Sequence, residues 1–324
     1  MRTEEDIKLI QKRAKRRNII YWGWIVALII AGACITGALN DALEWDRAFP
    51  WIMVLWVLFT MVILGLGVAL FDLSSSFSKD IKKYLVETAS DGMFDSFSYN
   101  PDEGFSVDVL DKADMMRGVY SCSTDDMMRG EYNDVKFCRG DVSINTGSTV
   151  SSTFHGSWTL YSFMKPFISD LQVTSQEMVA HSRVNRTIFT RKEEKRHLFK
   201  TGDPEFDSIF VCSGQDEQEA MTLLTPTVRK RLIRLYQDTG LPMIVGWKDN
   251  ELHFITGNAL APYGYRIHSK MDLEAMVADT RRKLYLTRRV IEELIMSRSI
   301  FSEYALEQYS MPADTGYGEE LRRQ

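Results

Sequence analysis

Two groups of basic side chains have the charge and spacing that best suggest a binding chemistry. Clustered cations attract anionic lipid headgroups, acidic protein surfaces or, as a weaker alternative, a nucleotide. Both groups are therefore candidate anion-binding sites. Solvated surface is the structural alternative, since charge runs commonly face water. The first group lies in the polar stretch 182–200 and the second on a helix predicted over 226–239: Arg183, Arg186, Arg191, Lys192, Lys195 and Arg196, then Arg229, Lys230, Arg231 and Arg234.

No catalytic or metal-binding motif accompanies these cations in the sequence. The five histidines lack zinc-ligand spacing, and there is neither a phosphate-binding glycine loop nor a GxSxG turn. We therefore expect a protein without enzymatic activity, cofactor or metal. An enzyme would need a pocket that gathers side chains remote in sequence, such as His155, Asp216 and Glu219.

The pentapeptide Asp-Met-Met-Arg-Gly occurs twice, at residues 114–118 and 126–130. The spacing of the two copies resembles that of a calcium loop, but Met127 and Arg129 stand where oxygen ligands would be required. Paired methionines also suit a soft metal, although methionine more commonly fills gaps in a core. We expect the repeat to mark two similar turns that lead into strands.

The elements that position these residues begin with two charge-free runs. Residues 19–39 and 51–71 each comprise 21 positions without Asp, Glu, Lys or Arg. At about 1.5 Å per residue, such a helix crosses the roughly 30 Å hydrocarbon core of a bilayer. A buried core helix is the alternative for either run, and a cleaved signal peptide is the alternative for the first. The length of the runs favours two transmembrane spans joined by a short loop over 40–50.

The distribution of Lys and Arg predicts the orientation of these spans. Residues 1–18 carry seven basic and three acidic side chains, whereas residues 40–50 carry one basic and three acidic ones. Basic flanks stay on the cytoplasmic side of a membrane. We expect a multi-pass protein of the cytoplasmic (inner) membrane, with both termini inside.

Charge and cysteine content restrict what the rest of the chain binds. Residues 73–324 hold 31 basic and 37 acidic side chains, a balance that does not attract nucleic acid. Three of the four cysteines lie in this part, without metal-ligand spacing. An odd number of cysteines fits a reducing compartment.

Hydrophobic periodicity predicts an α+β cytosolic domain over 72–268, with mixed or antiparallel strands. Residues 77–88 continue the second span as a helix, which we expect the turn residues at 100–104 to end. A long amphipathic helix follows over 269–310, packed on its own domain or against a partner or second copy, and then a frayed tail over 311–324. The domain thus follows a basic segment over 1–18 and a membrane hairpin over 19–71.

Local signals place several elements within this domain. Residues 207–213 predict a strand, and 218–223 a short helix. Thr225-Pro226 and Gly240 predict the start and end of the helix over 226–239. Alternation around the turn at 248–250 predicts a β-hairpin.

The segment 203–235 resembles the signature of an uncharacterised family of bacterial membrane proteins, a domain of unknown function. A Tyr-x-Pro turn at 99–101 and the stretch 126–130 extend the resemblance to residues 75–260, leaving the terminal helix outside it. The resemblance implies two N-terminal membrane spans and a gene that is often a neighbour of genes for LemA-type membrane proteins. It identifies no catalytic residues that could be transferred to this chain. The signature comprises Phe206, Phe210-Val211, Asp216, Glu219-Ala220, Leu223-Leu224-Thr225-Pro226 and Leu232.

Taken from the residues alone, the same motif is structural. Phe206 and Phe210 are spaced to anchor one face of a strand, Ala220 and Leu224 to pack a short helix, and Thr225-Pro226 to start the next helix. The sequence as a whole predicts an integral membrane protein that acts as a non-enzymatic scaffold or sensor, binding a protein partner or the leaflet surface. The alternative is a membrane effector that senses a small anionic, nucleotide-like ligand and acts through its membrane hairpin.

Overall fold

The computed structural model describes residues 4–42, 45–116, 121–145, 153–163, 166–167, 169–181, 197–257, 259–260 and 265–295. The chain divides into two compact units. The first comprises Met1–Thr88 and Tyr263–Val277, and the second comprises Ala89–Pro262 and Ala278–Gln324. Of the polar, basic stretch 182–200, residues 182–196 lie outside the described residues, as does the predicted helix beyond residue 295.

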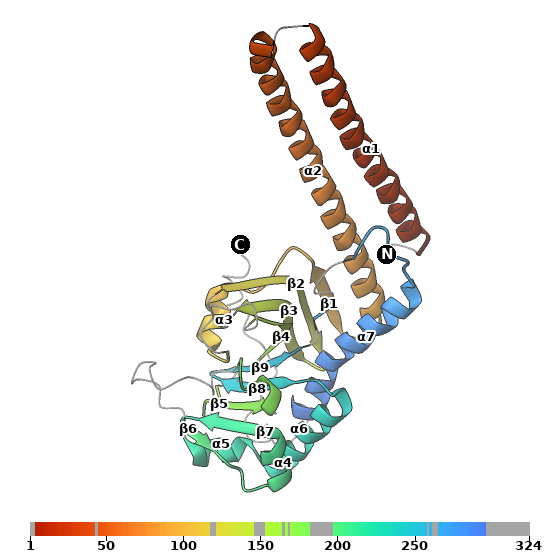
Figure 1. Ribbon diagram of the computed structural model, residues 1–324. Helices are drawn as coiled ribbons and strands as arrows, with labels where there is room; N and C mark the ends of the chain where they lie inside the picture. The colour runs from red at the N-terminus through yellow and green to blue at the C-terminus, as the bar shows by residue number, and fades with distance from the viewer. Residues whose placement is uncertain are drawn as a thin grey trace. The chain divides into compact units, whose positions relative to one another are not determined.

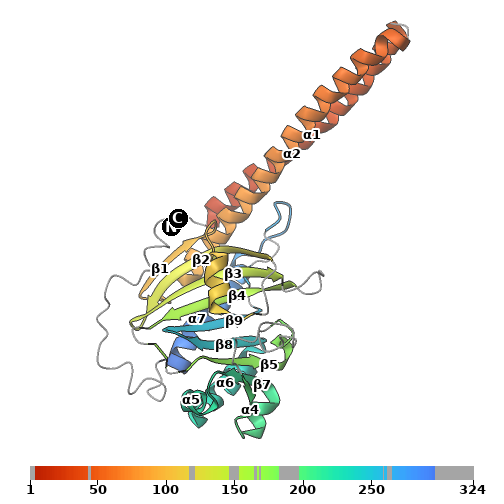
Figure 2. The same cartoon turned by 90° about the vertical axis from the view of Figure 1, so that its left-hand side faces the viewer.

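Two long helices, α1 (Glu4–Ala42) and α2 (Trp45–Ser90), dominate the first unit and lie side by side (Figure 1, Figure 2). Both are long and apolar enough to cross a membrane. The indole nitrogen of Trp56 donates a 3.1 Å hydrogen bond to Thr36 Oγ1 across the pair. The predicted loop over 40–50 is wrong in extent, since only residues 43–44 fall between the helices. Helix α1 extends three residues beyond the first charge-free run, and α2 begins six residues before the second run.

The N-terminal part of α1 and the C-terminal part of α2 share an apolar core. Ile7 and Ala14 of α1 pack against Phe77 and Ile81 of α2, and Ile267 covers them. The side-chain amide of Gln11 donates hydrogen bonds of 3.1 and 3.0 Å to the carbonyls of Ile267 and Ser269. The segment that begins at residue 265 therefore packs against the N-terminal part of α1 and the C-terminal part of α2.

The described residues of the second unit form one nine-stranded sheet, in the order β1-β2-β3-β4-β9-β8-β5-β7-β6. Every neighbouring pair is antiparallel, which confirms the α+β prediction with antiparallel strands. The strands are β1 (Ser96–Asn100), β2 (Ser121–Tyr132), β3 (Val135–Asn145), β4 (Thr153–Ser162), β5 (Leu171–Ser175), β6 (His197–Phe199), β7 (Phe210–Gly214), β8 (Met243–Lys248) and β9 (Glu251–Thr256).

Helices cover both faces of this sheet (Figure 1). Alternate residues of each strand point to opposite faces, so the sheet supports two separate cores. One core contains Phe137, Val245 and the α7 residue Val290, and the other contains Trp158, Ile255 and the α3 residue Leu110. The helices are α3 (Val107–Ala113), α4 (Pro204–Ile209), α5 (Glu217–Leu223), α6 (Pro226–Thr239) and α7 (Leu273–Val290), which a π-helical turn (Ile291–Ile295) extends.

Strong local signals placed three elements correctly. Helix α6 begins after Thr225, whose hydroxyl accepts a hydrogen bond from the Val228 N–H, and ends at Gly240 in the left-handed conformation. Helix α5 and the β8–β9 hairpin also lie where the sequence predicts them. Caps and tight turns depend on a few adjacent residues, so they can be recognised without tertiary information.

Three expectations about the second unit are wrong. Helix α2 ends at Ser90, and the turn after residue 100 ends strand β1 instead. The second Asp-Met-Met-Arg-Gly copy lies inside β2, where Asp126 (φ 58°) marks a bulge against β3 and not a turn. Residues 207–209 belong to helix α4, because Asp203 caps that helix and Pro204 occupies its first turn. Phe206 therefore anchors a helix and not a strand.

Candidate functional site

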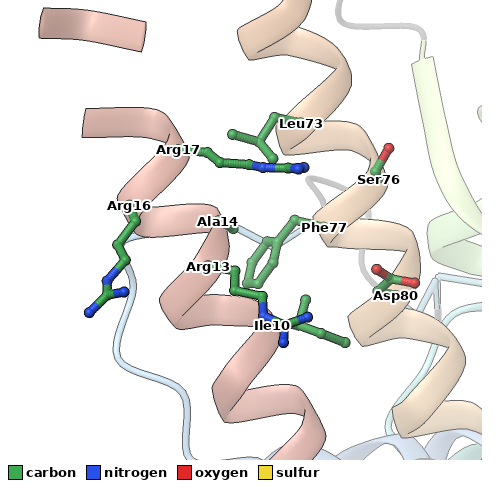
Figure 3. A pocket seen from close by; sticks show the side chains of 9 residues that line it. All are labelled: Ile10, Arg13, Ala14, Arg16, Arg17, Leu73, Ser76, Phe77 and Asp80. Carbon is green, nitrogen blue, oxygen red and sulfur yellow. The ribbon is translucent and has the colours of Figure 1, made fainter. Parts of the chain in front are cut away.

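A cleft of about 430 Å³ opens between α1 and α2 in the first unit (Figure 3). It combines several guanidinium groups with an apolar floor. Its walls are residues 10–17 of α1 and residues 73–80 of α2, and both charge-free runs lie between these two segments in the sequence. Its lining residues are Ile10, Arg13, Ala14, Arg16 and Arg17 of α1, and Leu73, Ser76, Phe77 and Asp80 of α2.

Helical spacing brings the arginines to this cleft. Arg13 and Arg17 lie on the same face of α1 because residues at i and i+4 are neighbours on a helix. Ala14 and Phe77 are buried, so the small alanine leaves room for the phenyl ring between the helices. In Figure 3 the Arg17 side chain extends toward Leu73, whereas Arg16 turns away from α2.

The cleft is positively charged. Three arginines line it, against the single carboxylate of Asp80. All three arginines are exposed, and within the described residues none of them pairs with an acidic side chain. An unpaired guanidinium group at such a cleft can bind phosphate or carboxylate through two parallel hydrogen bonds, and Arg13 and Arg17 share the helix face that meets α2.

The sequence prediction used Arg13, Arg16 and Arg17 only to orient the chain, and it missed them as a site. The available signal was their spacing relative to Ile10 and Ala14, which places charged and small apolar residues on one helix face. What the sequence could not supply was the partner helix, whose residues complete the cleft.

The basic residues predicted as contacts are distributed differently. Arg229 donates a 3.2 Å hydrogen bond to the Thr201 carbonyl, and Arg231 donates one of 2.7 Å to the Glu293 carbonyl. These two cations of α6 thus bind backbone carbonyls within the second unit. Lys230 and Arg234 are exposed on the same helix. The remaining predicted contacts lie outside the described residues: Arg183, Arg186, Arg191, Lys192, Lys195 and Arg196.

The motif residues of 203–235 lie at helix ends and in the core. The carboxylate of Asp216 accepts a 3.0 Å hydrogen bond from the Glu219 N–H and so caps α5. Pro226 is the first residue of α6, next to the capping Thr225. The rings of Phe206 and Phe210 lie 4.9 Å apart. Buried with them are Ala220 and Leu224.

The described residues contain no group of three or more His, Cys, Asp or Glu side chains arranged to hold a metal. The buried His253 accepts a 3.2 Å hydrogen bond from the indole nitrogen of Trp158. Its environment is that of a core histidine. His155, the histidine named above for a possible catalytic pocket, lies on β4, opposite Ser143 of β3.

A second concentration of charge is buried in the second unit. Arg139 and Asp141 of β3 are 1% and 5% exposed. Arg139 donates a 2.9 Å hydrogen bond to the Lys283 carbonyl of α7, and Asp141 accepts one of 2.5 Å from the Leu260 N–H. Thr287, which interrupts the apolar face of α7, lies beside Arg139. This cluster connects α7 to the sheet.

Burial raises the pKa of Asp141 from 3.8 to about 7, against the opposing attraction of Arg139. The folded state therefore binds more protons than the unfolded state between these two values, and the unfolding free energy should fall as pH rises from 3.8 to about 7. We expect Asp141→Asn to flatten this part of the profile. Urea denaturation at a series of pH values, followed by intrinsic tryptophan fluorescence, to which the buried Trp158 and Trp247 contribute, measures the effect.

The control for this prediction is Asp134→Asn, at an exposed turn between β2 and β3. It should leave the pH profile of the unfolding free energy unchanged. A profile that Asp141→Asn and Asp134→Asn affect equally would show that Asp141 does not titrate as described.

Comparison with known proteins supports an uncharacterised domain family. Residues 152–296 match the model of a family described as "Protein of unknown function (DUF3137)". The match includes the motif at 203–235 and continues through α7, which the sequence-based resemblance leaves out. It does not include the turn at 99–101 or the stretch 126–130.

The chain has limited similarity to curated proteins and to solved structures. A search of curated proteins found no match to the chain. Among solved structures, the mycobacterial trehalose monomycolate transport factor A aligns with 64% of this chain and 95% of its own. The two share 10% sequence identity, with a TM-score of 0.32.

Proposed function

We propose that this chain is an integral membrane protein anchored by α1 and α2, whose second unit serves as a non-enzymatic scaffold or sensor in the cytoplasm. The location of the exposed apolar side chains carries the proposal. Among the described residues, all large apolar side chains that are exposed lie between Leu9 and Phe71, apart from Val107, Leu198 and Tyr285. Soluble proteins rarely expose so large an apolar surface to water, whereas a bilayer would cover it.

The charge of the flanking segments supports the proposed orientation. Seven basic residues precede the first charge-free run, and the segment between the runs is acidic. The positive-inside tendency then favours a cytoplasmic location for both termini in the inner membrane. Most of the second unit follows the C-terminal end of α2 in the chain, so we place this unit on the cytoplasmic side as well.

The scaffold role is supported by an exposed edge of the sheet. Strand β1 is the terminal strand of the sheet that the described residues form, and alternate residues from Ser96 to Asn100 are exposed. Backbone groups on an edge strand can pair with an extended segment of another protein. A shallow cleft of about 340 Å³ beside it, lined by Phe97 and Phe137 among others, offers space for a partner side chain.

Two measurements on the full chain test this proposal. Alkaline extraction of membranes should leave the chain in the pellet, and its release would contradict the anchoring. Mild crosslinking in cells, followed by detergent extraction, should recover a specific complex. Recovery of the chain alone, together with unchanged growth of a deletion strain, would contradict the scaffold role.

A further inference from the structure

We infer that the cleft between α1 and α2 binds the phosphate of an anionic membrane lipid. The inference rests on the proposed membrane placement of these helices and goes beyond it by assigning a ligand class to particular side chains. Arg13 and Arg17 would hold the phosphate, and Arg16 would contribute charge at the rim.

The position of the cleft along the helices is the first argument. Arg17 lies just before the charge-free run 19–39, and Leu73 lies just after the run 51–71. In a helix pair whose charge-free runs occupy the hydrocarbon core, both walls of the cleft stand at the level of the cytoplasmic headgroups. Basic pockets between membrane helices at this depth bind acidic lipid headgroups.

The chemistry of the lining is the second argument. A phospholipid needs cations for its phosphate and an apolar path for its acyl chains. The arginines supply the first, and the floor formed by Ile10, Leu73 and Phe77 supplies the second. The apolar face of α2 continues from this floor into the run 51–71, because Leu70 and Leu66 lie on the same helix face as Leu73 and are half-buried. A soluble phosphate compound would use the cations alone.

The contribution of both helices is the third argument. The arginines come from α1, whereas Leu73, Ser76 and Phe77 come from α2. A headgroup in the cleft would therefore contact both helices next to their shared core around Phe77 and Ala14. Bound lipid is expected to stabilise the helix pair, because a ligand that binds only the folded state raises its stability.

Lipid titration of the detergent-solubilised full chain tests this inference. The probes are phosphatidylglycerol, phosphatidylcholine and inorganic phosphate, with binding measured by native mass spectrometry or by a shift in thermal unfolding. We expect phosphatidylglycerol to bind at least tenfold more tightly than phosphatidylcholine. We expect Arg13→Gln/Arg17→Gln to reduce phosphatidylglycerol affinity at least tenfold.

The matched control is Lys12→Gln/Lys15→Gln, which removes the same charge from the same part of α1 but from outside the cleft lining. It should change the affinity less than threefold. Equal losses in the two double variants would overturn the inference in favour of general surface attraction. Binding of inorganic phosphate as tight as that of phosphatidylglycerol would overturn it in favour of a soluble ligand.

Failure of this inference can be distinguished from failure of the proposed function. A chain that resists alkaline extraction but shows no preference for phosphatidylglycerol lacks the lipid site and keeps its anchor. A chain released by alkaline extraction contradicts the anchor itself. Circular dichroism and the unfolding transition of each double variant establish that it is folded, so a loss of binding reports on the site.

Discussion

Replacing Arg139 by leucine is expected to lower the unfolding free energy of the second unit by about 3–5 kcal/mol. The guanidinium group is 1% exposed and donates to the Lys283 carbonyl on α7. Removing it leaves that carbonyl without this donor and leaves Asp141 without the neighbouring cation. Urea denaturation of the full chain in detergent, followed by intrinsic tryptophan fluorescence, to which the buried Trp158 and Trp247 contribute, measures the loss.

Two further variants show whether this loss comes from the buried cluster. Lys136→Leu removes an exposed cation from the same strand and should change the unfolding free energy by less than about 0.5 kcal/mol. Arg139→Leu/Asp141→Leu should recover part of the loss, because replacing both partners leaves no buried charge uncompensated. A cost for Arg139→Leu as small as that for Lys136→Leu would contradict this account of the cluster.

Placing an arginine at Met61 is expected to raise the apparent insertion free energy of the second span by about 2.5–3.5 kcal/mol. Met61 lies near the middle of the run 51–71, and its side chain is 67% exposed. On a water-facing helix the same substitution would change stability by less than about 0.5 kcal/mol. The environment of the helix therefore decides the result. A microsomal insertion assay on the full chain measures the change.

Met61→Arg/Leu64→Arg makes the effect measurable even if the single variant still inserts almost completely. Val107→Arg is the control outside the spans, at an exposed apolar position on α3. It should leave membrane association and folding unchanged. Insertion of the double variant as complete as that of the unchanged chain, or equal effects at residues 61 and 107, would contradict the placement of residues 51–71 in the hydrocarbon core.

The sequence was most informative where the determinants of structure are local. The ends of α6 followed from Thr225-Pro226 and Gly240, since a cap and a left-handed C-terminal residue act on adjacent backbone groups. The two apolar helices followed from composition alone, because a long charge-free run has few alternatives in a folded chain.

Elements that depend on distant partners were harder to predict. Strand β1 is short, and its formation rests on pairing with β2, which follows it only after α3. Helix α4 carries the same start signal as α6, but its six residues gave too little periodicity to outweigh the apolar strand after it. Thr287 interrupts the apolar stripe of α7 for a reason that the sequence of α7 does not contain, since its hydroxyl lies beside the buried Arg139 of β3.

The candidate site shows the same division. The arginines were visible as charge, and their spacing placed Arg13 and Arg17 on one helix face. The cleft itself needed Leu73 and Phe77, which approach α1 only because the two helices lie side by side. A cleft between two helices is a property of their packing, so neither helix reveals it alone.

Cysteine labelling in intact cells tests the proposed membrane topology most directly. With the four native cysteines replaced, single cysteines at Asp41, Lys12 and Lys230 sample the segment between the spans, the N-terminal segment and the second unit. A membrane-impermeant maleimide should label Asp41→Cys in intact cells, and Lys12→Cys and Lys230→Cys only after permeabilisation. Labelling of Lys230→Cys in intact cells, or protection of Asp41→Cys until permeabilisation, would contradict the two-span topology.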